Sequence, residues 1–330
     1  MTDPALQPLV AAARSEARLV GVGLTDARSM RDVIWAAFRE EVAPWADLDY
    51  GQEVRGDAVA RRLTEPGAPP PDVLVVANPA HLAAAGLLEA HEQPYGDRYP
   101  AGWVEANGAW APLYVQPVVV VYNGHHVPVP PSRWEHMGDP GRAGKLVFEE
   151  PWAMLATGPA LAELSAVLGT AAWEELLRGM AGGDPLIVAD NERSVLEVAT
   201  GSRHTGLSNW NVAVRVRAAS PVRHVFLDPT PCIPGFAALP AGGSSPNLAR
   251  LFLAWLGSPG GQRAYAATGR IPAMPGIDAP TEMSRVLPSG VEPVFGAVDW
   301  LRDPEPWVER YRATFKAPRA PLRRGKMGGF

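Results

Sequence analysis

Apolar residues recur with a helical period near the end of the chain. They occupy positions i, i+3, i+4, i+7 and i+8, namely Leu248, Leu251, Phe252, Trp255 and Leu256. This spacing places them on one face of a helix. Ser245 can cap that helix, Pro246 suits its first turn, and Gly257 ends it. Ser258-Pro259 predicts the start of a second helix, which ends at Gly269.

Short apolar runs alternate with amphipathic segments in the first part of the chain. Leu19–Gly23 and Asp72–Ala77 predict buried strands, and a segment with helical periodicity follows each of them. Strands that are apolar throughout and alternate with helices are typical of an α/β fold, with a parallel sheet covered on both faces. Ligands of such sheets bind beyond the carboxyl ends of the strands, where loops lead into helix N-termini.

The same alternation continues to the end of the chain. Trp110–Asn123 predicts one long strand. We expect further strands at 145–150, 186–188 and 223–227, and helices at 157–168, 171–180, 191–200, from Trp210 onward and at 307–315. Three prolines within 228–236 predict a stiff connector, because the proline ring fixes the backbone.

Composition and charge narrow the class of protein. The 330 residues suit one large or two medium domains, and 47% apolar with 20% charged residues is ordinary for a globular chain. A net charge of −5 offers no electrostatic case for binding nucleic acid or an anionic membrane. A single cysteine, Cys232, excludes an intramolecular disulfide. No apolar run approaches the roughly 20 residues that span a bilayer.

No catalytic or nucleotide-binding motif is visible. GxSxG, HExxH, the P-loop and CxxC are absent, and Gly21-Val22-Gly23 lacks the third glycine of a dinucleotide fingerprint. His125-His126 lacks a third metal ligand at motif spacing, so we expect a solvated loop pair. We likewise expect His204 at the surface and Cys232 in a packing role.

The segment 256–272 reads Leu-Gly-Ser-Pro-x-Gly-Gln, then a short predicted helix, then Gly-Arg-Ile-Pro. This order of parts resembles the closing segment of type II periplasmic (extracellular) solute-binding proteins of ABC transporters, and it is closest to the iron(III)-binding branch. Four more segments are similar to the family in order and spacing, at 9–23, 70–90, 110–123 and 134–146. Together they make the resemblance specific.

The resemblance implies two α/β lobes, each a mostly parallel sheet flanked by helices, joined by two hinge crossings. One lobe would comprise 1–116 plus 234–285 and the other 117–233 plus 286–316. We expect 317–330, which is rich in basic residues, proline and glycine, to be a flexible tail.

The resemblance also implies a function. The lobes would close on a small polar or charged solute and deliver it, without catalysis and without a cofactor, to an ABC permease of the inner membrane. We expect a monomer. Met1–Val10 shows no signal peptide. The location is therefore periplasmic or extracellular if a leader was removed, and otherwise cytoplasmic. A cytoplasmic enzyme or a sensor module on the same scaffold stays open.

Polar residues at the predicted strand ends and helix starts are the candidate ligand-binding set. They are Thr25, Asp26, Asn78, Gln116, Glu149, Thr157, Asn191, Asn209 and Trp210. Each alone is often a cap or turn residue, but the two-lobe fold implies that they converge on one cleft. We expect no catalytic residue and no metal ligand among them.

The chain departs from the iron-binding branch at the metal ligands. Asn209-Trp210-Asn211 stands where the branch has a tyrosine pair, and the second strand ends in Ala77-Asn78 instead of a carboxylate. Amides that hydrogen-bond and an indole that stacks suit an organic solute better than a ferric ion. The sign of the solute's charge stays open. Glu149, Glu150 and Asp190 favour a cation, and Arg28, Arg193 and Arg203 favour an anion.

Overall fold

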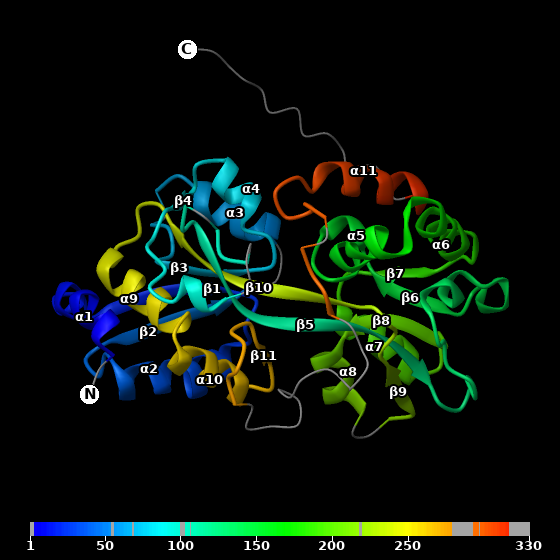
Figure 1. The fold of residues 1–330 in the computed structure, drawn as a ribbon, viewed down its shortest axis with the longest axis horizontal. Coiled ribbons are helices and arrows are strands. Elements are labelled where there is room, and N and C mark those ends of the chain that lie inside the picture. Colours follow the sequence, from blue (N-terminus) through cyan, green and yellow to red (C-terminus); the bar gives the residue numbers. More distant parts are fainter. Residues whose placement is uncertain are drawn as a thin grey trace, which may run out of the picture.

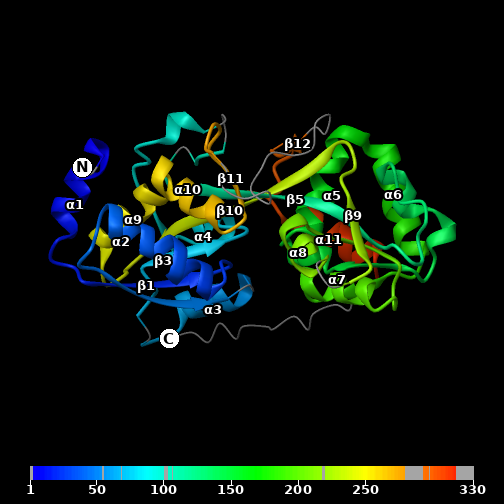
Figure 2. The same ribbon diagram turned by 90° about the horizontal axis from the view of Figure 1, so that it is seen from below.

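The helices and strands form two groups, joined by the long strands β5 (Trp110–Asn123) and β10 (Thr230–Pro240) (Figures 1 and 2). This arrangement is seen in a computed structural model that describes residues 3–53, 56–67, 69–99, 103–105, 107–217, 220–278, 293–296 and 298–316. The predicted tail at 317–330 lies outside the described residues. No helix in the described ranges is long and apolar enough to cross a membrane.

The secondary structure follows the predicted alternation. The other strands are β1 (Arg18–Gly23), β2 (Asp47–Gln52), β3 (Val73–Val76), β4 (Leu88–Glu89), β6 (Leu146–Glu149), β7 (Leu186–Val188), β8 (Thr205–Asn209), β9 (Val222–Val225), β11 (Ile271–Pro272) and β12 (Pro293–Val294). The α-helices are α1 (Gln7–Ala13), α2 (Ala36–Glu41), α3 (Gly56–Thr64), α4 (Ala80–Ala84), α5 (Thr157–Leu168), α6 (Thr170–Gly182), α7 (Asn191–Ala199), α8 (Trp210–Arg217), α9 (Pro246–Leu256), α10 (Pro259–Ala267) and α11 (Glu305–Thr314). A π-helical stretch, η2 (Ser29–Trp35), leads directly into α2.

The strands share one sheet path in the order β2-β1-β3-β10-β5-β8-β6-β7. In the first group β1 runs parallel to β2 and β3, and in the second β6 runs parallel to β7 and β8. β5 and β10 pair antiparallel between Trp110 and Pro117, and beyond that point β5 pairs with β8 and β9. The predicted α/β class with a mostly parallel sheet in each half is confirmed.

Each half of the sheet is covered on both faces, because successive residues of its strands enter different cores. In β3, Val73 and Val75 face the core under α9, whereas Leu74 and Val76 face a second core beside α4. In the other half, alternate valines of β5 divide between a core under α5 and α6 and a core under α7. This period-two alternation is what two buried faces require.

β5 also marks the change from one half to the other. Its Leu113 and Tyr114 belong to the core of the first group, and its Val118 and Val120 belong to that of the second. Trp300 and Tyr311, near the end of the described chain, are buried in the second core. The domain division at residue 116 stays a prediction, and the predicted switch at 285–286 lies outside the described residues.

Four local expectations differ from the structure. The connector expected at 228–236 is mostly β10, which has prolines at Pro231, Pro234 and Pro240. β2 was not expected, because only Tyr50 of its six residues is buried and the strand has no apolar run. α3, which carries two arginines in its last turn, was also not expected.

The fourth difference concerns the start of α9. Ser245 stands at the N-cap position, but its hydroxyl donates to the carbonyl of Arg18 and does not cap the helix. Glu16 supplies the cap instead, since its carboxylate accepts the backbone N–H groups of Asn247 at 3.3 Å and Leu248 at 2.7 Å. A carboxylate at this end also complements the helix dipole. The cap thus comes from a residue 232 positions away in the chain.

Candidate functional site

A cavity of about 500 Å³ lies between the two groups of elements. The carboxyl ends of parallel strands from both groups reach it. β1 leads into Leu24 and Asp26, β2 ends at Gln52, β6 ends at Glu149, and β8 ends at Asn209. Its wall is completed by the middle of the two joining strands, through Gln116 of β5 and Gly235 of β10. This is the place where open parallel sheets bind ligands.

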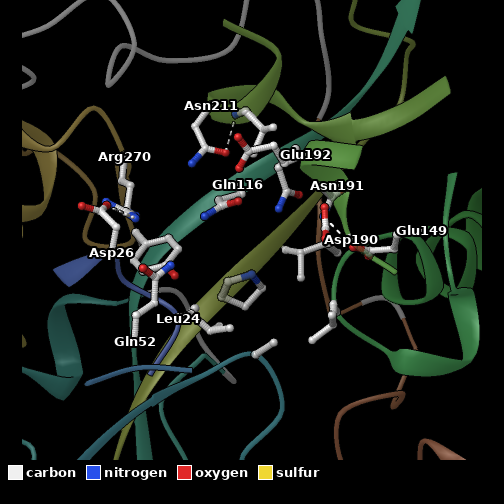
Figure 3. A pocket seen from close by; sticks show the side chains of 18 of the residues that line it. Leu24, Asp26, Gln52, Gln116, Glu149, Asp190, Asn191, Glu192, Asn211 and Arg270 are labelled. Carbon is white, nitrogen blue, oxygen red and sulfur yellow. Dashed lines mark hydrogen bonds and ion pairs between the residues drawn. The ribbon is translucent and has the colours of Figure 1, made fainter. Parts of the chain in front are cut away.

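Figure 3 shows how the polar side chains divide between the two sides of the cavity. Asp26, Gln52 and Arg270 come from the first group, and Asp190, Asn191 and Glu192 from the second. Gln116 lies between them on β5. The cavity therefore offers amides and charges on both sides, which suits a polar solute.

Glu149 organises the second side. It is only 1% exposed. Its Oε1 accepts the backbone N–H groups of Ala156 at 2.6 Å and Thr157 at 2.8 Å, so it occupies the start of α5. Its Oε2 accepts a hydrogen bond from Asn191 Nδ2 at 2.6 Å. Burial raises the pKa of Glu149 to about 7, and the nearby carboxylates of Asp190 and Glu150 add to the effect.

Asp26 and Arg270 form an ion pair on the first side, with Asp26 Oδ2 and Arg270 Nη2 3.4 Å apart. Burial opposes ionisation of Asp26, but hydrogen bonds from Ser29 and the charge of Arg270 outweigh it and hold the pKa of Asp26 below its usual value. The guanidinium also lies 5.2 Å from the centroid of the Tyr114 ring and donates to Thr268 Oγ1 at 2.9 Å. Arg270 is thus held in place without a ligand.

Several buried polar atoms beside the cavity have no hydrogen-bond partner among the described residues. They are Oδ1 of Asn191, Oδ1 of Asn209 and Nε of Arg270, and all three residues line the wall. The Asn191 amide is oriented by its bond to Glu149, so its Oδ1 is left as an acceptor. A buried polar atom without a partner costs free energy that a bound solute or water can recover.

Five of the nine candidate residues line this cavity: Asp26, Gln116, Glu149, Asn191 and Asn209. Asn78 lines an adjoining cavity of about 730 Å³, which shares Leu24, Ala77 and Leu155 with the first and is otherwise mostly apolar. There the Asn78 amide oxygen accepts the backbone N–H of Ala80 at 3.1 Å, as a turn residue does.

Thr25, Thr157 and Trp210 do not line either cavity. Thr25 and Thr157 are completely buried behind the wall. The indole of Trp210 packs against a core of the second group and is not part of the cavity wall. Its ring packs 5.6 Å from that of Phe226, and its Nε1 donates to His224 Nε2 at 3.3 Å. The first turn of α8 points Asn211 into the cavity and Trp210 toward the core.

The histidines and the cysteine lie away from this wall. His126 stacks on His204 with ring centroids 4.4 Å apart, beside the carboxyl end of β5 in the second group. Cys232 is buried in β10, and burial raises the pKa of its thiol to about 12. Both observations agree with the packing and surface roles expected for these residues.

Sequence reasoning missed several wall residues, among them Gln52, Tyr114 and Arg270. Gln52 ends the strand β2, whose pairing with β1 brings it to the cavity edge. Arg270 belongs to the Gly-Arg-Ile-Pro phrase, and it reaches the site because β11 pairs with β5 beside Tyr114. That phrase, which contains Arg270, was the only sequence feature that could have pointed to one of these residues. Among the described residues, no three His, Cys, Asp or Glu side chains are grouped to hold a metal ion.

Comparison with known protein families gives a match over most of the chain. Residues 68–295 match the family described as bacterial extracellular solute-binding protein. None of the curated protein sequences matches the chain significantly.

Among solved structures, the chain is similar to iron-bound HitA from Pseudomonas aeruginosa, with a TM-score of 0.71, 20% identity and coverage of 90% of this chain and 99% of that one. It is also similar to the periplasmic binding protein AfuA from Actinobacillus pleuropneumoniae with fructose-6-phosphate bound, with a TM-score of 0.77, 14% identity and coverage of 92% and 100%. For the ferric binding protein from Campylobacter jejuni the values are 0.73, 14%, 90% and 99%. At these identities the structures show a shared fold.

The family match covers more than half of the chain, and the two-group architecture agrees with it. The chain belongs to the bacterial extracellular solute-binding proteins, the solute-capturing components of ABC importers.

Proposed function

We propose that this protein captures a small organic solute in the cavity between its two groups of elements and delivers it to an ABC permease of the inner membrane. The observation that carries the proposal is the cavity itself, whose polar wall comes from strand ends on both sides. A solute that contacts Asp26 or Gln52 on one side and Asn191 or Asn209 on the other would hold the two sides together. The affinity for the solute would then come from closure of the two sides of the cavity around it.

The amides set the chemistry of recognition. Gln116, Asn191, Asn209 and Asn211 each bring a carbonyl acceptor and an NH₂ donor to the wall. Such groups bind hydroxyl, amine and carbonyl functions of an organic molecule. A ferric ion would instead need several anionic oxygen ligands around one point. We therefore propose an organic solute bound without catalysis or a cofactor, by a monomer working in the periplasm or outside the cell.

A solute library screened by thermal shift tests the proposal, because a ligand that binds only the folded protein raises its melting temperature. Hits are then titrated by calorimetry against wild type, Asn209→Ala and, as a control, Gln7→Ala on the exposed side of α1. We expect at least one hit whose affinity falls about tenfold or more in Asn209→Ala and is unchanged in Gln7→Ala. Equal affinity in all three proteins would remove the cavity from the binding site. Conversion of the hit, followed by mass spectrometry, would contradict a passive role.

A further inference from the structure

Three helix starts that could bind an anion at this cavity are already filled by carboxylates of the chain. Asp26 Oδ1 accepts the N–H of Ser29 at 2.8 Å, at the start of η2. Glu149 Oε1 occupies the first amides of α5, and Asp190 Oδ1 accepts the N–H of Arg193 at 2.7 Å, at the start of α7. Helix N-termini attract phosphates and carboxylates because their N–H groups are unpaired. In this protein, carboxylates of the chain already accept hydrogen bonds from N–H groups at these helix starts.

The two arginines on the wall are also paired within the protein. Arg270 interacts with Asp26, and Arg193 forms an ion pair with Glu197 one turn further along α7. Each guanidinium charge is therefore balanced by a neighbouring carboxylate. The unpartnered Nε of Arg270 is a donor that a neutral hydroxyl or carbonyl oxygen of the solute can satisfy.

Asp190 adds a negative charge to the wall. Its carboxylate accepts a backbone N–H, whereas the ion pairs of Arg193 and Arg270 are made with Glu197 and Asp26. Asp190 is exposed at the cavity, beside Asn191 (Figure 3). The amide of Asn191, fixed by Glu149, presents an unpartnered oxygen at the same place, and Asn209 adds a second one. A carboxylate together with buried carbonyl oxygens forms a set of acceptors, which an N–H-bearing cation can satisfy and an anion cannot.

From these contacts we propose that the cavity selects an organic solute bearing an ammonium or guanidinium group, and discriminates against phosphorylated and carboxylated solutes. The cationic end binds at Asp190, Asn191 and Asn209, and hydroxyl or carbonyl oxygens of the solute face Arg270 and Gln52. This selectivity rests on the proposed function, since it names the class of solute for the same cavity. It separates this chain from the similar structure that holds fructose-6-phosphate.

The test uses molecules that share a carbon skeleton and differ in charge. Glucosamine, glucose and glucose 6-phosphate form one series, and 1,4-diaminobutane, 1,4-butanediol and succinate form another. Both series, with guanidinium compounds, are placed in the solute library, and affinities are measured by calorimetry at low and at physiological salt. We expect hits to be amines or guanidines, at least tenfold tighter than their neutral and anionic counterparts, and weakened by salt.

Charge-only variants then locate the cationic end. Asp190→Asn removes the charge but keeps a good N-cap residue, so the fold is preserved. Asp3→Asn is the matched control, because Asp3 also caps a helix start, in η1 (Pro4–Leu6), and lies away from the cavity. We expect Asp190→Asn to weaken a cationic hit about tenfold, while Asp3→Asn leaves its affinity unchanged.

The outcomes separate the two proposals. A library whose hits are anions, or a cationic hit indifferent to Asp190→Asn but sensitive to Asn209→Ala, would overturn the charge selectivity and leave solute capture intact. Hits of any charge that are insensitive to every cavity variant would overturn solute capture in this cavity, and the charge selectivity with it.

Discussion

Asn191 donates a hydrogen bond from Nδ2 to Oε2 of Glu149 across 2.6 Å, and this bond couples three elements at the cavity wall. Glu149 ends β6 and holds the first amides of α5, while Asn191 begins α7. The side chain that faces the cavity is thus positioned by a buried carboxylate behind it. Because Oδ1 of Asn191 has no partner, a protonated Glu149 has an acceptor within reach if the amide rotates.

We predict that Glu149→Gln removes a pH dependence of stability. Burial raises the pKa of Glu149 from 4.5 to about 7, so the folded state holds this proton more tightly than the unfolded chain does. The resulting stabilisation is full below the unfolded value of 4.5 and is lost as pH rises through 7. Relative to Glu149→Gln, the wild type should lose up to about 3 kcal/mol of unfolding free energy between these limits. Urea denaturation of both proteins from pH 4.5 to 7.5 measures this difference. Parallel profiles would show that Glu149 titrates normally.

We predict that Trp210→Ala lowers stability and leaves solute affinity within about twofold of wild type. The indole packs against Phe226 and bonds to His224, and complete removal of a core tryptophan costs about 3–5 kcal/mol. Trp210 is only partly buried, so we expect a loss of about 2 kcal/mol by chemical denaturation. Asn209→Ala is the comparison, since it should do the reverse. A large loss of affinity in Trp210→Ala would return the indole to the binding site.

We predict that Gly235→Ala damages both the fold and the cavity. A Cβ at this position of β10 would overlap the ring and hydroxyl of Tyr114, which lines the wall beneath Arg270. Overpacking of this kind typically costs about 1–3 kcal/mol. Gly141→Ala is the matched control, because its Cβ would meet nothing within 4 Å. Thermal denaturation and titration with a library hit should show losses only in Gly235→Ala.

We predict that Glu16→Ala destabilises the protein by about 1–2 kcal/mol through the loss of the α9 cap. The carboxylate of Glu16 also accepts the side-chain amide of Asn247 at 2.8 Å, so three donors lose their partner together. Glu175→Ala, on the exposed side of α6, should stay within about 0.5 kcal/mol of wild type. Denaturant midpoints of the two variants make the comparison. Equal midpoints would show that water replaces the cap at no cost.

The sequence predicted those features that arise from neighbours along the chain. The bounds of β5 and α5 are those expected from the apolar runs, and Ser258 caps α10 through the N–H of Gly261 as its position suggested. The sequence missed β2, because one buried tyrosine among polar residues leaves no periodic signal. It also assigned the cap of α9 to the local Ser245, whereas the tertiary contact from Glu16 provides it.

The residues of the candidate site likewise fall into those that the sequence predicted and those that it could not place. Asp26, Glu149, Asn191 and Asn209 could be predicted because parallel strands end together, whatever packs on them. Trp210 could not be placed, since its direction depends on how the first turn of α8 is rotated against β9. Arg270 could not be placed either, since it reaches the cavity only where β11 pairs with β5. The periodicity of apolar residues reflects local backbone geometry, so the sequence determined the helices and strands and their order. Side-chain direction at the ends of elements depends on contacts between distant segments, and only the tertiary structure decided it.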